Sequence, residues 1–422
     1  MIANLTKMGD HYSALLEDVE LTPKIREILA GLDPSAQEHK QAISLPPECY
    51  TSEEWFEFEK RAVFDRDWVC VAHTGMIPNP GDFQTINMNN DPLIVMRDQQ
   101  GVVKVMSAVC AHRGRVLCEG SGNNLEKLVC PLHHWTYNLD GELIGAPEMN
   151  SVLPLAELKK QAFLPILRSE IWQGFIFVNM DGHARPLVPR LKRISKEIEN
   201  HHMGEMLATP TFEFPPYDWN WKYMQENAIE PYHTWYLHRG IHDFAPSRLA
   251  SFDEWDTEDD AAVYHPTGFL ELDQNFNMSF KCLFPIIKTL TEKERRRVMF
   301  VTVPPNLFFG CVPDGVFYYI IRPQSANRIV LRVGFLYPAE TLRDRNFEYI
   351  FKMTVDGLCA YNDQDVASNA SVHLGLKSRF APRSRYAPKE KTLSHMNRWL
   401  VQRYKSYAAA LEARERAAAA GR

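Results

Sequence analysis

The stretches Cys110-Ala-His112-Arg-Gly114 and Cys130-Pro-Leu-His133 decide how this chain is interpreted, because each sets a cysteine within three residues of a histidine. Two thiolates and two imidazoles can hold a [2Fe–2S] cluster, with the thiolates on one iron and the imidazoles on the other. Structural zinc also accepts two sulfurs and two nitrogens. Zinc modules usually pair cysteine with cysteine and histidine with histidine, so the mixed pairs favour the cluster over zinc.

The residues around these ligands, CAHRG and CPLHHWTYNLDGEL, resemble the Rieske domain of the non-haem iron oxygenases, large-subunit type. That family usually has glycine or alanine between the second histidine and the tryptophan, where this chain has His134. Since Cys110, His112, Cys130 and His133 fill the four positions of the cluster, we interpret His134 as a surface or interface histidine. The resemblance leaves little support for zinc.

Length and composition restrict the class of protein. A chain of 422 residues is expected to form two domains, and its net charge of −6 argues against nucleic acid as the main partner. No apolar run is long enough to cross a bilayer, and the N-terminus lacks a secretory pattern. Apart from Cys110 and Cys130, the cysteines show no paired spacing, so a reducing cytoplasm is expected.

The chain divides by pattern into segments of different character. DPLIVMRD and VVKVMSAVC, joined by Gln99-Gln100-Gly101, predict a hairpin that leads to Cys110. FVTVPPNLFFGCV, GVFYYIIRP and RIVLRVGFLYP predict an antiparallel sheet. With the resemblance, the expected fold class is α+β: an N-terminal all-β Rieske domain and a C-terminal catalytic domain with a large antiparallel sheet flanked by helices. The expected segments are an N-terminal arm (1–40), the Rieske domain (41–183), the catalytic domain (184–400) and a helical tail (401–422).

A second metal site is expected near His233 and His238. Five residues apart on a regular helix, the two side chains point about 140° away from each other. They can bind one ion only where the helix ends or bulges. The pattern Glu230-x-x-His233-x-x-x-x-His238, behind Asn220-Trp221-Lys222 and Glu226-Asn227, resembles the mononuclear-iron segment of the same family, in the same chain order.

A ferrous centre that activates oxygen needs two histidines and one carboxylate, with positions left open. By the family's pattern the carboxylate lies on a late helix, ten residues before a Gly-Leu pair. Asp365 fits this pattern before Gly375-Leu376. Asp363 and Asp356 are competitors, and a solvated helical aspartate is the alternative interpretation for all three.

Glu230 and Asn227 are the candidate catalytic residues. On a helix, Glu230 shares the face of His233, so its carboxylate can accept the ring N–H that is not bound to metal. The resemblance implies that Glu230 also links to the cluster ligand of a neighbouring subunit, His133 by position. Family members that oxidise aromatic rings usually carry Asp at this position, whereas several that act on carnitine-like or betaine-like substrates carry Glu. Asn227 corresponds to a family asparagine near the iron; helix-surface hydrogen bonding is its alternative role.

The resemblance implies the terminal component of a multicomponent oxygenase, with a [2Fe–2S] cluster and mononuclear Fe(II), that acts on a small molecule and O2. The chain has no glycine-rich dinucleotide fingerprint, so electrons from NAD(P)H must come through a separate reductase, with or without a ferredoxin. Electron transfer between subunits implies a closed ring, most simply a homotrimer. Whether a small β subunit accompanies the chain stays open.

Three functions are weighed. Hydroxylation of a small aromatic compound takes precedence, as the commonest activity of the family. Monooxygenation or N-dealkylation of a quaternary amine is favoured by Glu230 and by the stretch from PIIKTLTEKERRR to PPNLFFG. An aromatic cage would bind such a cation, although aromatic residues in strands more often belong to the core. Candidates for the cage are Trp235, Tyr236, Phe308, Phe309, Tyr318 and Tyr319. The third function is a non-catalytic zinc or electron-transfer protein.

Overall fold

The computed structural model describes residues 16, 18–88, 90–254 and 260–420. These residues form two compact units, one consisting mainly of Arg66–Arg185 and the other of Glu17–Asp65 with Pro186–Arg422. The division differs from the expected segments, because residues 41–65 group with the second unit rather than with the first. Of the predicted arm, residues 1–15 and 17 lie outside the described residues, and residues 18–40 also belong to the second unit.

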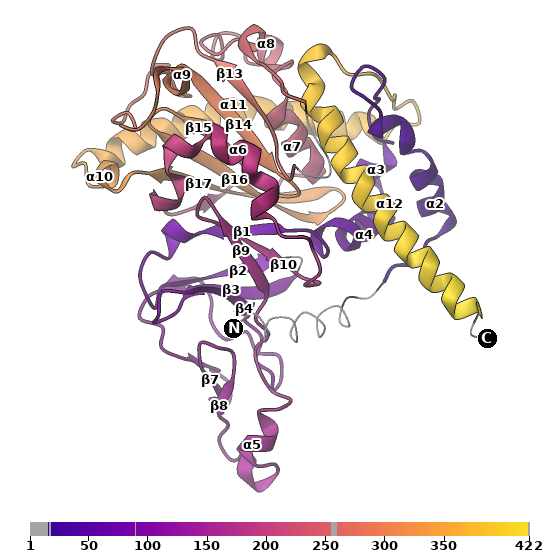
Figure 1. Cartoon of the computed structure of the whole chain (residues 1–422), viewed down its shortest axis with the longest axis vertical. Helices are drawn as coiled ribbons and strands as arrows, with labels where there is room; N and C mark the ends of the chain where they lie inside the picture. Colours follow the sequence, from indigo (N-terminus) through magenta and orange to yellow (C-terminus); the bar gives the residue numbers. More distant parts are fainter. Residues whose placement is uncertain (1–15, 17, 89, 255–259, 421–422) are drawn as a thin grey trace. The chain divides into compact units, whose positions relative to one another are not determined.

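The first unit is built from three small antiparallel sheets (Figure 1). Their strand orders are β1-β10-β9, β4-β3-β2-β5 and β6-β7-β8. The strands are β1 (Val69–His73), β2 (Phe83–Met88), β3 (Asp91–Arg97), β4 (Val103–Ser107), β5 (Ser121–Gly122), β6 (Leu128–Val129), β7 (Thr136–Tyr137), β8 (Leu143–Gly145), β9 (Arg168–Trp172) and β10 (Phe175–Asn179). One short helix, α5 (Leu155–Leu158), follows β8.

The predicted hairpin is present as β3 and β4, with Leu93 opposite Ser107 and Arg97 opposite Val103. Gly101 closes the turn with a φ of +82°, a conformation that glycine adopts without strain. Ile94, Met96 and other apolar side chains of this hairpin pack in one cluster with Cys110, Cys130 and Trp135. The metal-binding loops therefore rest directly on the core of the first unit.

The second unit contains a seven-stranded antiparallel sheet of order β11-β17-β16-β15-β14-β13, with β12 also paired to β17. Pro304 and Pro305 divide the predicted strand FVTVPPNLFFGCV into two, because proline cannot donate to the hydrogen-bonding ladder of a sheet. The strands are β11 (Leu207–Ala208), β12 (Phe212–Glu213), β13 (Val263–Gly268), β14 (Arg297–Val303), β15 (Leu307–Val312), β16 (Gly315–Ser325) and β17 (Arg328–Tyr337).

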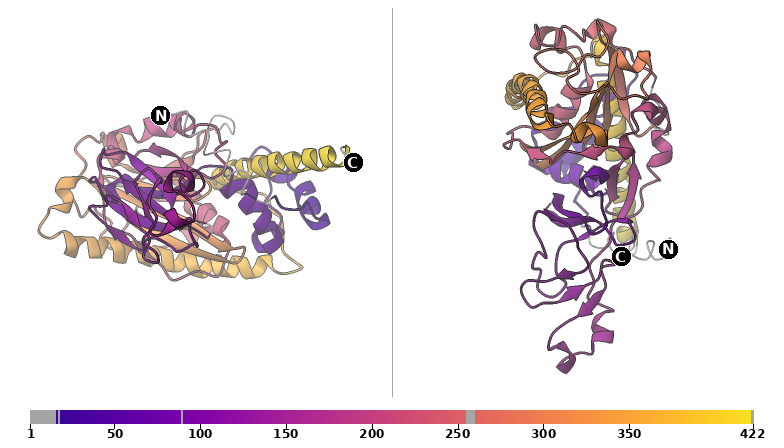
Figure 2. Two further views of the ribbon diagram at one scale, coloured as in Figure 1. Left: turned by 90° about the horizontal axis from the view of Figure 1, so that it is seen from below. Right: turned by 90° about the vertical axis from the view of Figure 1, so that its left-hand side faces the viewer.

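Helices flank this sheet, as expected for the fold class (Figure 2). The long helix α11 packs against β17, where the rings of Phe351 and Phe335 lie 5.1 Å apart. The equally long α12 packs beside α4 through Tyr404 and Trp55. The helices of the second unit are α2 (Pro23–Ala30), α3 (Glu48–Thr51), α4 (Glu53–Glu59), α6 (Lys192–Glu197), α7 (Trp221–Ile229), α8 (Thr234–Leu237), α9 (Glu292–Arg295), α10 (Ala339–Leu342), α11 (Phe347–Leu376) and α12 (Lys391–Ala420).

None of the helices within the described ranges combines the length and the apolar composition that a bilayer crossing requires.

A buried ion pair joins three helices of the second unit. The carboxylate of Glu59 on α4 accepts hydrogen bonds from Lys222 Nζ at 2.7 and 2.9 Å and from Trp221 Nε1 at 2.6 Å, both on α7. Tyr404 on α12 donates its hydroxyl to the same carboxylate. Glu59 and Lys222 are both fully buried. Because α7 leads to the two histidines, this network fixes the helix that supplies the candidate site.

Glu59→Gln is expected to lower the free energy of unfolding of the second unit by about 3–5 kcal/mol, because Lys222 would remain buried without an ionised partner. A urea titration followed by tryptophan fluorescence measures the change. Glu57→Gln is the matched control: Glu57 is exposed, pairs with Lys60, and should change the free energy of unfolding by less than about 0.5 kcal/mol. Equal urea midpoints for the two variants would contradict this account of the helix junction.

Candidate metal centres

His233 and His238 flank a single short helix that follows a break in the helical structure. Helix α7 ends at Ile229, and Glu230 takes an extended conformation with φ −117° and ψ 124°. This is the conformation favoured for a residue that precedes proline, here Pro231. Helix α8 then starts directly after His233 and ends directly before His238. The two rings consequently approach to 5.1 Å between centroids. The segment thus forms two helices, α7 and α8, and the two histidines lie at the ends of α8.

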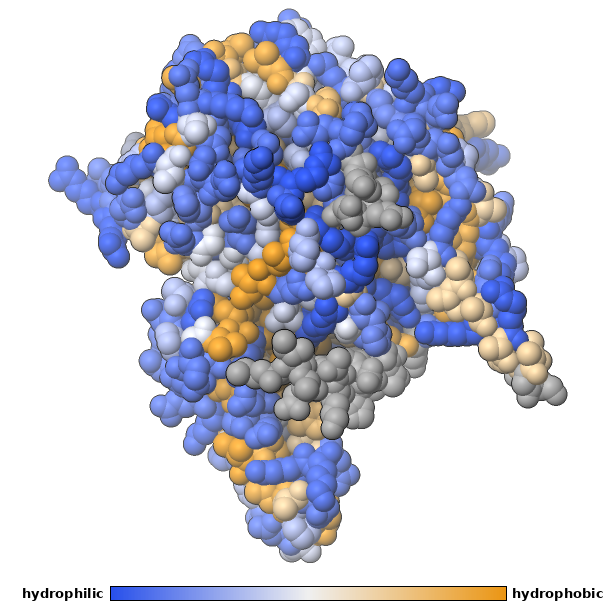
Figure 3. All heavy atoms as spheres, viewed as in Figure 1, coloured by the Kyte–Doolittle hydropathy of each residue, from blue (hydrophilic) through white to orange (hydrophobic). Residues whose placement is uncertain are grey.

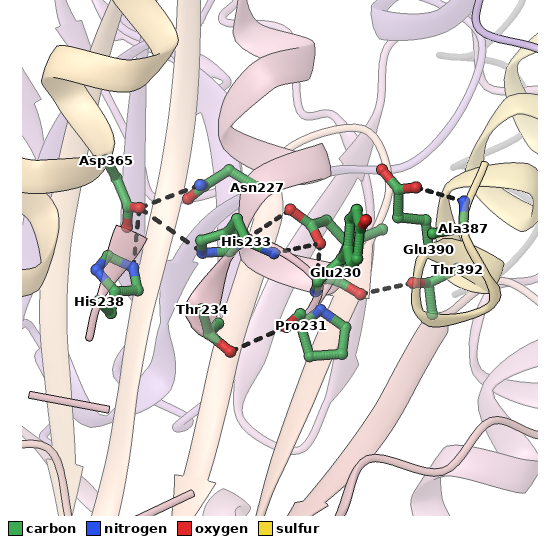
Figure 4. Close-up of polar contacts among 12 residues, drawn as sticks. Asn227, Glu230, Pro231, His233, Thr234, His238, Asp365, Ala387, Glu390 and Thr392 are labelled. Carbon is green, nitrogen blue, oxygen red and sulfur yellow. Dashed lines mark hydrogen bonds and ion pairs between the residues drawn. The ribbon is translucent and has the colours of Figure 1, made fainter. Parts of the chain in front are cut away.

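The third member of the cluster comes from α11. Asp365 Oδ1 lies 3.0 Å from His238 Nε2 and 3.8 Å from His233 Nε2 (Figure 4). Within the described part of the chain, these three residues form the one group whose ligand atoms all lie within 4.8 Å of one another. Two imidazoles and one carboxylate are the donor set of non-haem ferrous sites, so the residues present fit that metal.

The competing aspartates lie elsewhere on α11. Asp363 is exposed. Asp356 is exposed and pairs with Lys352 Nζ at 2.6 Å. The structure thus brings Asp365, but neither Asp363 nor Asp356, to the histidines. That Asp365, His233 and His238 bind iron stays a prediction.

Both histidines are oriented through their Nδ1 atoms. Glu230 Oε1 lies 2.5 Å from His233 Nδ1, and Gln364 Oε1 lies 2.8 Å from His238 Nδ1. A ring N–H held by such an acceptor leaves Nε2 as the metal-binding atom. Sequence reasoning missed Gln364, because a glutamine on a helix carries no signal beyond its place next to Asp365.

Charge at the site favours a cation. Burial alone would lower the pKa of His233, yet Glu230 and Asp365 raise it above its ordinary value. Carboxylates that stabilise a proton on this imidazole would also stabilise a metal ion beside it. Asn227 Nδ2 donates to Asp365 Oδ1 at 3.1 Å, so the structure joins the second candidate catalytic residue to the triad (Figure 4).

A pocket opens beside the triad, between the sheet and helices α7 and α11. Six aromatic side chains line it: Phe276, Phe300, Phe308, Phe317, Tyr319 and Tyr361. Of the predicted cage residues, Phe308 and Tyr319 line the pocket, whereas Phe309 and Tyr318 are buried in the core and Trp235 and Tyr236 are exposed.

Two further histidines line the pocket. Burial and the neighbouring His238 and His233 lower the pKa of His242 to about 3. Burial, the largest cause, also lowers the pKa of His265 to about 4. Both imidazoles are therefore neutral at pH 7. Neither residue stood out in the sequence, since an isolated histidine is most often a core residue.

The cysteine–histidine set lies in the first unit, on the loops that follow β4 and β6. Cys110 and Cys130 are buried, whereas His112 and His133 are exposed. The two imidazole rings are 4.7 Å apart between centroids. Tyr137 lies with its hydroxyl 3.3 Å from Cys110 Sγ. The site is thus asymmetric, with thiolates toward the core and imidazoles toward solvent.

This set fits a two-metal cluster better than a single zinc ion. Zinc–ligand bonds of about 2.0–2.3 Å would hold all four ligand atoms within roughly 4 Å of one another. Within the described residues, these four side chains do not form a group that could hold a single ion. The neighbouring His134 has a φ of +57°, a left-handed conformation that glycine adopts without strain.

Each of the two units matches a known protein family. Residues 67–161 match the family described as "Rieske [2Fe-2S] domain", and residues 193–406 match "Ring hydroxylating alpha subunit (catalytic domain)". The chain therefore belongs to the alpha subunits of the Rieske-type ring-hydroxylating oxygenases. The expected family, fold class and cofactor types are confirmed.

Curated relatives include enzymes of two kinds. The carnitine monooxygenase oxygenase subunit of Escherichia coli (strain K12) is 32% identical over 209 residues, which are 48% of this chain and 54% of the relative. The glycine betaine monooxygenase oxygenase subunit of Pseudomonas aeruginosa is 31% identical over 218 residues, 51% of this chain and 48% of the relative. Biphenyl 2,3-dioxygenase subunit alpha of Rhodococcus jostii is 32% identical over 197 residues, 45% of this chain and 42% of the relative. The chain thus spans about half the length of the curated relatives it matches.

Solved structures agree on the fold. A quaternary ammonium Rieske monooxygenase superposes with a TM-score of 0.72 at 22% identity, covering 92% of this chain and 100% of the other. Naphthalene 1,2-dioxygenase from Rhodococcus sp. superposes with a TM-score of 0.74 at 18% identity, covering 91% and 99%. At these identities the likeness concerns the fold alone.

Asp365→Ala is expected to remove the mononuclear iron, about one of three irons per chain, while the cluster is retained. Iron analysis together with acid-labile sulfide measures both centres. Asp363→Ala is the matched control, because it removes an exposed carboxylate from the same helix. Loss of iron from Asp363→Ala and not from Asp365→Ala would overturn the assignment.

Proposed function

We propose that this chain is the oxygenase component of a multicomponent Rieske monooxygenase that oxygenates a small quaternary ammonium compound. The observation that supports this proposal most directly is the pocket beside the triad. Aromatic side chains line this pocket, and its described lining residues include no lysine or arginine. Aromatic faces attract a quaternary ammonium group, and a basic residue in the wall would repel it. The carnitine and glycine betaine relatives support the same substrate class.

In this proposal His233, His238 and Asp365 hold the mononuclear iron, and Cys110, His112, Cys130 and His133 hold the cluster. When bound, the iron supplies reductive activation of dioxygen and the cluster supplies one-electron transfer. The protein's own contribution is to orient the imidazoles, to place the substrate and to exclude water by the aromatic walls. Asn227 contributes by holding the Asp365 carboxylate in place.

The overall reaction consists of an oxygenation and a C–N bond cleavage. Oxygenation of a C–H bond next to nitrogen consumes O2, two electrons and two protons, and yields the alcohol and water. The alcohol then cleaves at its C–N bond into a carbonyl compound and a tertiary amine and releases a proton. The electrons come from a separate NAD(P)H-dependent reductase, since the sequence contains no dinucleotide fingerprint.

Glu230 is proposed to act as the positioning residue between the two centres. Its Oε1 contacts His233 Nδ1, and its Oε2 accepts the backbone N–H groups of Tyr232 at 2.5 Å and His233 at 3.1 Å. These hydrogen bonds hold the Glu230 carboxylate against Nδ1 of His233. Support for a link to a second copy comes from the exposure of His133 in the first unit.

Apolar exposure also supports an assembly. Val129, Leu132 and Ile144 in or beside the cluster loops are each at least 39% exposed. In Figure 3 apolar side chains gather over the part of the first unit that holds β7, β8 and α5. Such a patch at the exposed imidazoles suits contact with another protein. We propose a homotrimer in which this surface contacts the catalytic unit of the next copy.

Glu230→Gln is expected to retain both metal centres and to lower the rate of substrate-dependent oxygen uptake by roughly 10–100-fold, the usual effect of removing a partner of a metal-binding histidine. The amide cannot supply the negative charge that Glu230 offers to the imidazole, and its NH2 group cannot accept the backbone hydrogen bonds. Metal analysis and single-turnover kinetics measure the two effects. An unchanged rate in a fully loaded variant would refute the role given to Glu230.

A second candidate is hydroxylation of an aromatic compound, which the sequence analysis placed first. The biphenyl dioxygenase relative and the same aromatic walls favour it. The relatives that act on quaternary amines support the alternative better, and for that reason it is the function proposed here.

Oxygen uptake with a substrate panel distinguishes the two candidates. We expect uptake coupled to product formation with trimethylammonium compounds and not with aromatic acids or hydrocarbons, when a reductase and NADH are supplied. His233→Ala is the control that should abolish uptake. Coupled turnover of aromatic compounds alone would reject the quaternary ammonium proposal.

A further inference from the structure

The pocket offers a bound molecule few polar contacts. Its charged lining residues, among those described, are Glu230 and Asp365, and both are acidic. Glu230 is engaged with His233, and Asp365 faces both histidines. The groups that remain for a substrate are therefore neutral, and none can neutralise an anion away from the triad.

His265 is the polar side chain that stands out on the sheet side. It lies on β13, is 1% exposed and belongs to the pocket lining. Its Nδ1 lies 3.3 Å from Thr267 Oγ1, a second buried lining residue. Its Nε2 is buried and has no hydrogen-bond partner among the described residues. A buried ring nitrogen without a partner destabilises the protein, and a bound molecule could supply the missing bond.

The location of His265 separates it from other buried histidines. His242 also lines the pocket, but its ring stacks at 6.0 Å on that of His238 and thus belongs to the surroundings of the triad. His201 is buried with an unpartnered Nδ1, yet it does not line the pocket. Among these three histidines, only His265 has a nitrogen without a hydrogen-bond partner on a pocket wall that is separate from the metal ligands.

We infer that His265 is a specificity-determining residue: its Nε2 hydrogen-bonds a neutral polar group of the substrate, such as a hydroxyl or carbonyl, and the pocket disfavours substrates that carry a carboxylate. The inference rests on the proposed function in one respect: the substrate carries a trimethylammonium group at the end that does not contact His265. It therefore separates this chain from relatives named for carnitine and glycine betaine, since both of those compounds carry a carboxylate.

Two physical arguments support this specificity. A neutral imidazole donates or accepts a hydrogen bond but supplies no positive charge, and burial keeps His265 neutral by lowering its pKa to about 4. A carboxylate placed in an aromatic pocket without a lysine or arginine would lose its hydration without gaining an ionic partner. A hydroxyl loses less hydration and regains one hydrogen bond.

Equilibrium binding without oxygen tests the inference, because no turnover occurs. Calorimetry on the iron-loaded full chain would compare choline, ethyltrimethylammonium, which lacks the hydroxyl, and glycine betaine. For the wild-type chain we expect choline to bind about fivefold to tenfold more tightly than ethyltrimethylammonium, the usual worth of one hydrogen bond, and glycine betaine to bind weakest. His265→Phe keeps the ring volume and should remove the preference for the hydroxyl, with iron content unchanged.

His201→Phe is the matched control and should keep the preference for choline, because it replaces a buried histidine outside the pocket. His265→Gln is the second variant in case the phenylalanine disturbs folding; it retains a hydrogen-bonding end and should keep part of the preference. Tighter binding of glycine betaine than of choline, or an undiminished hydroxyl preference in His265→Phe, would overturn the inference and leave the proposed function intact.

The two proposals fail in different ways. If no trimethylammonium compound binds, but aromatic alcohols bind more tightly than the matched methylarenes and His265→Phe removes this difference, the proposed function is wrong while the role of His265 holds.

Discussion

Two imidazoles five residues apart approach one carboxylate oxygen, because His233 and His238 lie at the two ends of the short helix α8, which follows the backbone break at Pro231. A continuous helix would direct His233 and His238 to different faces. The extended conformation of Glu230 ends α7, and the single turn of α8 separates the histidines so that their Nε2 atoms both approach Asp365. The same break allows Glu230 to accept backbone hydrogen bonds while it contacts His233. The positions of His233 and His238, and the orientation of the His233 ring by Glu230, are therefore determined within residues 229–238.

The sequence predicted the parts of the structure that local spacing determines. The β3–β4 hairpin, the mixed cysteine–histidine pairs and the need for a helix end or bulge at His233 and His238 followed from residue order and turn chemistry. Asp365 could be ranked above Asp363 and Asp356 only by a family pattern, because three aspartates on one helix are indistinguishable by composition. The geometry separates them, since only Asp365 faces the histidines.

Features that depend on long-range packing could not be predicted. His242 and His265 line one pocket only when the segment after α8 and strand β13 come together, and Gln364 contacts His238 only when α11 packs beside them. The same limit applies to the aromatic cage: strand alternation could not decide that Phe308 and Tyr319 line the pocket while Phe309 and Tyr318 face the core. Residues 41–65 group with the second unit through long-range contacts such as that of Glu59 with Lys222, which are far apart in the chain.

The division of the chain into units means that the Rieske segment is inserted into the catalytic unit rather than placed before it. The two ends of the insert lie close together, because Trp68 Nε1 donates to the carbonyl oxygen of Arg185 at 2.8 Å, as is usual for domains that interrupt a host. During synthesis, α4 is made before α7 and α12. Glu59 on α4 can therefore contact Lys222 and Tyr404 only after those two helices have been synthesised. The iron–sulfur segment can complete its own fold within that interval, so the order of assembly is determined by the connectivity of the chain.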